Sequence, residues 1–132
     1  MEFCKINGKT YDVLVTAISE TFDILYSENT GRNVGVGAPM ILDPLGTFFG
    51  HKVTFRRRKD KEAEYDELFD FFSTPRYDGF EVELAHGQTI LKYKAYVGKG
   101  ERALKRIDEK QNKIYWDEMS VTFVPMEAQV IP

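Results

Sequence analysis

The two histidines are the side chains of this sequence best suited to acid–base or metal chemistry. His51 falls within a strand-like run, and His86 falls within the turn His86-Gly87-Gln88. A histidine paired with a carboxylate can hold a metal or transfer a proton. Neither histidine, however, belongs to an HxH or HExxH spacing. We therefore interpret both as surface or structural residues.

The other reactive side chains also lack the surroundings that catalysis needs. Gly98-Lys99-Gly100-Glu101 lacks the frame and the following helix of a phosphate loop, no serine lies in a GxSxG motif, and Cys4 is the only cysteine. An acidic run is interpreted as the solvated face of a helix: Glu62, Glu64, Asp66, Glu67 and Asp70. The sequence predicts no catalytic residues, no cofactor and no metal site, and hence a protein that is not an enzyme.

One dense basic run stands out, Arg56-Arg57-Arg58-Lys59. Arginine and lysine can bind phosphates, but Asp60, Glu62 and Glu64 follow at once and reduce the local positive potential. We favour a strand end with exposed arginines, or a salt-bridged contact with a neighbouring subunit, over a phosphate contact.

The composition predicts one folded, β-rich domain over residues 1–132. The chain is 42% hydrophobic and 14% aromatic, with a formal net charge of −3. Aromatic and β-branched residues fit a pleated, half-buried surface, and this charge does not favour a nucleic-acid or anionic-membrane partner. No apolar run approaches the roughly 18 residues of a membrane span, and the first residues lack an apolar signal core. A single cysteine excludes an internal disulfide, so we expect synthesis in a reducing cytoplasm.

Alternating patterns predict most of the strands. Residues 3–6 and a long strand from Thr10 flank Asn7-Gly8, a strong hairpin signal because both turn residues tolerate positive φ. The apolar face of the long strand changes side near Ile18, which predicts either a bulge or a strand that bends between two sheets. Further strands are expected at 47–58, 80–85, 89–97, 102–107 and 114–124, followed by an extended tail from Pro125.

Residues 60–73 carry the one helical pattern. Asp60 is a candidate N-cap, and Thr74-Pro75 ends the helix. One apolar face recurs at helical spacing: Tyr65, Leu68, Phe69 and Phe72. Six or seven strands with one helix predict an α+β, mainly β fold, built either as two packed antiparallel sheets or as a partly open β-barrel.

Residues 27–46 form a loop that is long for a domain of this size. They include four glycines and two prolines and follow no sustained period. A lid over a small molecule and a loop that folds against a neighbouring subunit both fit this composition. Because no catalytic pattern accompanies the loop, we favour the second. Sheet edges without proline or charge guards also invite pairing with another copy.

Six stretches carry a further signal: INGKTYDV, ILYSENTGR, LDPLGTFFGHKVTFRR, YDELFDFFSTPRYDG, YKAYVGKGERAL and IYWDEMSVTFVPMEAQVIP. Through them the whole chain resembles small proteins encoded in the tail-morphogenesis region of prophages of Gram-positive gut bacteria. The order of elements is also similar to the shared fold of tail-tube, tail-terminator and baseplate-hub subunits. The resemblance implies a structural protein of a long-tailed phage, made in the host bacterial cytoplasm and carried in the virion tail.

In those families a sheet of each subunit joins a ring, commonly of six, and a long loop reaches the next subunit or ring. The resemblance therefore implies a homo-oligomer that contacts other tail proteins, meets DNA only as passing cargo and has no membrane partner. Glu81 and Glu83, or alternatively Asp23 and Ser27, suit a lumen, since a non-basic lining lets DNA slide. Subunit contacts are expected at the loop, the basic run and the tail: Val34, Val36, Met40, Ile41, Leu42, Arg56, Arg57, Arg58, Val130 and Ile131.

The alternative is a small monomeric binding module whose residues 27–46 close over a ligand. It predicts a solitary chain with a defined pocket and a melting temperature that rises with ligand. The assembly interpretation predicts rings or tubes and a solution mass well above that of one chain.

Overall fold

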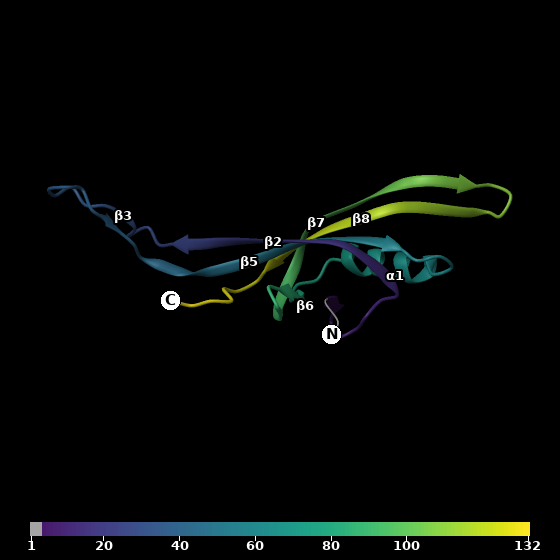
Figure 1. Ribbon diagram of the computed structural model, residues 1–132, viewed down its shortest axis with the longest axis horizontal. Coiled ribbons are helices and arrows are strands. Elements are labelled where there is room, and N and C mark those ends of the chain that lie inside the picture. The colour runs from purple at the N-terminus through teal and green to yellow at the C-terminus, as the bar shows by residue number, and fades with distance from the viewer. Residues whose placement is uncertain (1–3) are drawn as a thin grey trace.

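The structure, a computed structural model, describes residues 4–132. Figure 1 shows an elongated molecule in which a hairpin projects from each end of a central body. The prediction of a mainly β fold with a single helix is confirmed. In chain order the elements are β1 (Cys4–Ile6), β2 (Val13–Tyr26), β3 (Gly31–Arg32), β4 (Met40–Ile41), β5 (Pro44–Arg57), α1 (Glu62–Ser73), β6 (Phe80–His86), β7 (Thr89–Asp108) and β8 (Lys113–Pro125).

Six strands form one antiparallel sheet in the order β1-β6-β7-β8-β5-β2, and β3 with β4 forms a small separate sheet. The large sheet curls so far that β6 touches β5 across its inner face, although β7 and β8 lie between them in the sheet. Nε2 of His51 lies 3.3 Å from the carbonyl oxygen of Ala85, and the rings of Phe49 and His86 meet edge to face with centroids 4.8 Å apart. Since β1 and β2 do not pair within residues 4–132, the arrangement is a partly open barrel.

The inner face of the sheet and α1 enclose an aromatic core. The ring centroid of Phe72 lies 5.7 Å from that of Phe55 on β5 and 5.3 Å from that of Phe123 on β8. The buried Tyr65 hydroxyl donates to the backbone oxygen of Asp117 at 2.7 Å, and burial raises the pKa of Tyr65 to about 12. The helix therefore fills one end of the partly open barrel.

Both long hairpins continue beyond this body. β5 pairs with β8 only from His51 to Phe55, whereas it pairs with β2 along nearly its whole length. Residues 20–50, which include the small sheet, form a projection that we call the loop arm. Residues 99–118 of β7 and β8 form a second projection, the hairpin arm, at the opposite end of the molecule (Figure 1).

The irregularity expected in the long strand is confirmed. The β2–β5 register shifts between Val15 and Ala17, near the change of apolar face. Residues 102–107 are strand, as expected, but they belong to β7, which runs unbroken from Thr89 to Asp108 and shifts register against β8 between Val97 and Lys99. The tail after β8 is extended and forms a single bridge between Val130 and Thr47.

One local prediction is confirmed in part, and another is wrong. Asn7 and Gly8 adopt positive φ values of 55° and 77°, and Ile6 and Lys9 form an antiparallel bridge across this turn. The pairing does not extend into a hairpin of β1 and β2, because β1 pairs with β6 and β2 pairs with β5. Asp60 does not cap α1, because it takes a positive φ of 63° and Lys61 occupies the N-cap without a side-chain hydrogen bond. The expected first strand is present as β1, and its expected first residue, Phe3, lies outside the described residues.

The tail can lie against β5 because residue 46 is glycine. The backbone N–H of Gln129 donates to the backbone oxygen of Thr47 at 3.0 Å. A Cβ on Gly46 would lie 2.6 Å from the Cβ of Ala128 and 3.0 Å from the backbone oxygen of Val130. No real Cβ tolerates the first of these distances, so a larger side chain would force the tail away.

Gly46→Ala is therefore expected to lower the free energy of unfolding by about 1–3 kcal/mol, the usual cost of an overpacked contact. Chemical denaturation measures the loss, and faster amide hydrogen exchange at Gln129 and Val130 locates it in the tail. Gly100→Ala is the matched control, because a Cβ there meets its nearest atoms at 3.7 Å. Equal stability of the two variants would contradict this role of Gly46.

Candidate subunit interface

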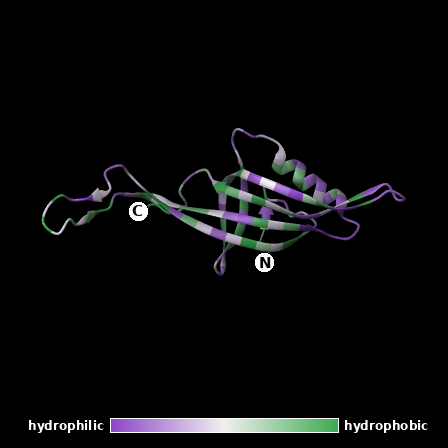
Figure 2. Cartoon of the chain, turned by 90° about the horizontal axis from the view of Figure 1, so that it is seen from above, coloured by the Kyte–Doolittle hydropathy of each residue, from purple (hydrophilic) through white to green (hydrophobic). Residues whose placement is uncertain are grey.

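The loop arm gathers much of the exposed apolar surface. Of the twenty large apolar side chains that are exposed among residues 4–132, ten lie between positions 22 and 45. Phe22 is 65% exposed, and Val34 and Val36 are fully exposed. Figure 2 shows apolar residues, in green, at the tip of this arm, whereas the turn of the hairpin arm is hydrophilic. Apolar surface concentrated in one place is typical of an interaction site.

Both faces of the loop arm are apolar. Side chains alternate along a strand, so Phe22, which lies opposite Phe49, and Leu25, which lies opposite Gly46, point to different faces. A two-stranded hairpin has no third layer with which to cover either face. Burial of these side chains would require another surface.

The tip of the arm is more regular than the sequence suggested. Residues 27–46 contain β3, β4 and the start of β5, with Gly31 opposite Ile41 and Arg32 opposite Met40. The Ser27 hydroxyl donates to the Asp43 carboxylate, and the Asp43 amide donates to the Thr30 hydroxyl at 2.9 Å. These bonds hold the tip as an extension of the hairpin. The predicted contact residues Val34, Val36, Met40, Ile41 and Leu42 are brought together there, all exposed.

β2 presents a long open edge. Its one neighbour among the described strands is β5. Its 14 residues contain no proline and two charged residues, Glu20 and Asp23. Natural proteins usually protect such edges with charge, proline or a covering segment, so this strand is suited to pair with another chain.

The C-terminal tail lies at the base of the loop arm. The side-chain amide of Gln129 accepts the Phe49 N–H at its oxygen and donates to the Phe49 carbonyl from its nitrogen, both at 3.0 Å. This pair of bonds completes the inner edge of β5 where β8 no longer reaches it. The predicted contact residues Val130 and Ile131 follow directly and remain exposed.

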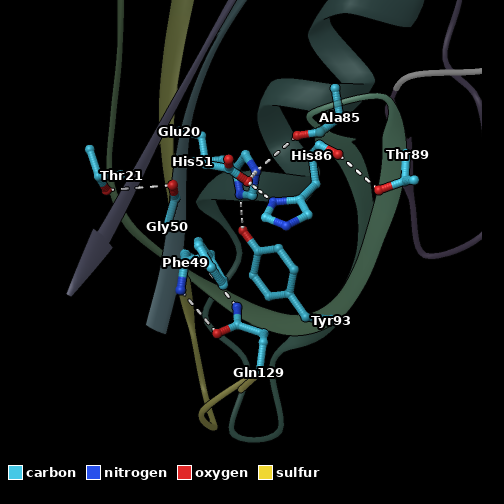
Figure 3. Close-up of polar contacts among 10 residues, drawn as sticks. All are labelled: Glu20, Thr21, Phe49, Gly50, His51, Ala85, His86, Thr89, Tyr93 and Gln129. Carbon is cyan, nitrogen blue, oxygen red and sulfur yellow. Dashed lines mark hydrogen bonds and ion pairs between the residues drawn. The ribbon is translucent and has the colours of Figure 1, made fainter. Parts of the chain in front are cut away.

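A buried polar cluster joins the loop arm to the body (Figure 3). His51 is 1% exposed, and its Nδ1 lies 2.8 Å from the Tyr93 hydroxyl. Its Nε2 lies 3.0 Å from Glu20 Oε2, and the same oxygen lies 2.6 Å from His86 Nδ1. Since Glu20 and the Ala85 carbonyl only accept, Nε2 of His51 carries the proton and Nδ1 accepts from Tyr93.

Burial controls the ionisation of this cluster. It lowers the pKa of His51, and the Glu20 carboxylate only partly opposes that effect. It also raises the pKa of Tyr93, which therefore stays protonated and donates. Among residues 4–132 no group of three or more histidine, cysteine, aspartate or glutamate side chains is arranged to hold a metal ion. The cluster is a cross-strand support, in line with the structural interpretation of both histidines.

The remaining predicted residues lie elsewhere. The arginine run sits at the end of β5 remote from the loop arm, with Arg56 exposed, and Arg58 pairs with Asp12 at 3.1 Å. Glu81 and Glu83 lie on β6, where they face Lys94 and Lys92 across the strands, and Glu81 pairs with Lys92 at 3.6 Å. Their surroundings are therefore of mixed charge rather than uniformly acidic.

Sequence reasoning missed four residues of this region. Glu20, Tyr93 and Gln129 carry no local motif, because each acts on a partner far away in the chain. Phe22 had a usable signal, because the run FDILY places apolar residues at both odd and even positions, and so on both faces of the strand. That pattern predicts a strand whose two faces are both apolar and therefore both suited to burial.

Comparison with known proteins adds no relative: no protein-family model matches the chain, and a search of curated proteins finds no similar sequence. The fold itself contains no helix, within residues 4–132, that is long and apolar enough to cross a membrane.

Acidification is expected to destabilise the protein through His51. Burial places its folded pKa below the ordinary value of 6.5, so the unfolded chain binds a proton more readily than the folded chain. The stabilisation is complete above pH 6.5 and is lost as the pH falls below that value. Denaturant titrations from about pH 7.5 to about pH 5 measure it.

His51→Gln is expected to be less stable at neutral pH and to show a weaker pH dependence in this range. His86→Gln, which alters the solvent-exposed side of the same cluster, is the matched control and retains more of the dependence. A His51→Gln variant with the full pH dependence of the unaltered protein would contradict the assignment.

Proposed function

We propose that this chain is a structural subunit that assembles with copies of itself into a ring or tube. One observation carries the proposal: the loop arm projects beyond the core with apolar side chains on both faces. The open edge of β2 runs along the same arm, so edge pairing and apolar burial act on one surface. A second copy supplies both a strand and an apolar face, and repeated contacts of this head-to-tail kind close into rings.

The assembly proposed is a phage or prophage tail, with the chain as a tail-tube subunit or a ring-forming adaptor. The resemblance in sequence to tail-morphogenesis proteins supports this class. In this proposal the subunit is made in the bacterial cytoplasm, contacts other tail proteins and meets DNA only as cargo. The arm tip and the exposed tail reach the neighbouring subunit through Val34, Val36, Met40, Ile41, Leu42, Val130 and Ile131, with Arg56, Arg57 and Arg58 as a further contact.

The proposal assigns the outer face of β6 to the lumen of the ring. Glu81 and Glu83 lie there with Lys92 and Lys94, so the lining is polar and close to neutral. Such a surface holds DNA weakly, which suits passage rather than capture. The alternative of a monomeric binding module gains no support from the arm tip, since Val34 and Val36 are fully exposed rather than packed over the body.

The test is the solution mass of the protein over a concentration series, with negative-stain microscopy of the concentrated sample. The unaltered chain is expected to form discrete rings or tubes. Val36→Asp, Met40→Asp and Leu42→Asp combined should weaken association at least about 100-fold, because each buried apolar side chain contributes about 1.5–3 kcal/mol.

The matched control introduces the same three charges at polar, exposed positions: Gln88→Asp, Gln111→Asp and Asn112→Asp. It should assemble as the unaltered chain does, and circular dichroism should show all variants folded. A protein that stays monomeric when concentrated, or a tip variant that assembles normally, would overturn the proposal. A monomer whose melting temperature rises with a small compound would support the binding module instead.

Charge reversal tests the lumen separately. Glu81→Lys with Glu83→Lys should leave the ring intact but make it retain DNA, because the lining then becomes strongly basic. Gel-shift binding of duplex DNA to assembled rings measures the effect. If rings of the reversed variant bind DNA no more tightly than unaltered rings do, this face is not the lumen.

A further inference from the structure

The basic run, named above as a further subunit contact, also lines a cavity. β5 and β8 are paired as far as Phe55 and Met119 and then diverge. At this fork lies a notch of about 330 Å³, lined by Trp116 and by five cationic residues: Arg56, Arg57, Arg58, Lys59 and Lys105. The sequence places four of these cations side by side, and the fold adds Lys105 from the hairpin arm.

The positive charge of the notch is poorly balanced. One carboxylate, Asp117, contributes to its wall. Arg58 is paired with Asp12 at 3.1 Å, and Arg57 is only loosely paired with Glu62 at 3.8 Å. Among the residues that the structure describes, no carboxylate lies within ion-pair distance of the three other cations, Arg56, Lys59 and Lys105. A chain with a net charge of −3 thus concentrates unneutralised positive charge in one small cavity.

Arg57 is held in place beside the notch. Its guanidinium carbon lies 4.7 Å from the centre of the Tyr115 ring. Its Nε is buried and finds no acceptor among the described residues. A buried donor without a partner is unfavourable, so Arg57 would be stabilised by an acceptor that reached this atom. An arginine fixed in this way loses little freedom when it binds.

We propose that the notch binds the phosphate groups of a phosphorylated ligand. Guanidinium groups bind phosphate oxygens through paired hydrogen bonds, and a phosphate carries more charge into a small space than a single carboxylate does. Leu14 and Trp116 form an apolar wall beside the cations, which suits an organic group attached to the phosphate. A nucleic-acid strand and a small phosphorylated compound share this chemistry. The proposal does not depend on ring assembly.

Trp116 supplies a direct readout, because it is the one tryptophan of the chain. Its fluorescence is followed while inorganic pyrophosphate, or separately a single-stranded oligothymidine, is added at low ionic strength. Saturable binding is expected with at least one probe, weakening as salt is raised. Arg56→Gln with Lys105→Gln should reduce the affinity about tenfold or more, since charge-assisted hydrogen bonds are lost.

Lys110→Gln with Lys113→Gln is the matched control. It removes two exposed positive charges near the turn of the hairpin arm, outside the lining of the notch, and should bind as the unaltered chain does. Pyrophosphate binding alone would assign a small phosphorylated ligand, and oligothymidine binding alone would assign a nucleic-acid strand.

Three results would overturn the proposal: no binding of either probe, equal losses in the notch variant and the control, or tighter binding of poly-glutamate than of both phosphate probes. The last would indicate an acidic protein segment as the occupant.

Discussion

The limited pairing between β5 and β8 determines the shape of the whole molecule. β5 has 14 residues, but its ladder with β8 covers only His51 to Phe55. At one end of that ladder β5 and β2 continue without β8 and become the loop arm. At the other end the strands part around the basic notch, and β8 continues with β7 as the hairpin arm. The two projections and the cavity therefore arise from one short ladder.

A hairpin that extends beyond the rest of its sheet needs stabilising contacts where it leaves the body. Two sets of hydrogen bonds provide them. His51 links Glu20 of the arm to Tyr93 and Ala85 of the body. Gln129 satisfies both backbone groups of Phe49 with its side-chain amide, which replaces the missing ladder partner. Beyond Phe49 much of the apolar surface of the arm stays exposed. The arm is thus held firmly at its root and is largely uncovered toward its tip, so burial of that surface against another copy would add stability.

The sequence predicted those features whose causes are local. The stripe from Tyr65 to Phe72 places the helix, and the change of apolar face near Ile18 marks the bulge beside Ala17. The hairpin signal of Asn7-Gly8 correctly indicated a turn with positive φ but not its strand partners, because pairing of β1 with β6 is decided by residues more than 70 positions away.

For the candidate interface, too, the features with local causes could be predicted and those that depend on distant residues could not. Val34 to Leu42 could be proposed as contact residues from the composition of residues 27–46 alone. The meeting of His51, Glu20 and His86 could not, since it depends on the curl of the sheet that brings β6 over β5. The notch forms where the pairing of β5 with β8 ends. The end of that pairing is set by strand register, which cannot be predicted from any single stretch of the sequence.

Amide hydrogen exchange of the loop arm at low and high protein concentration tests the central claim most directly. If copies of the chain cover the arm, the amides of β2 and of residues 27–43 gain protection as the concentration rises, while those of the buried β6 stay unchanged. Exchange rates in the arm that are the same at every concentration would contradict the account.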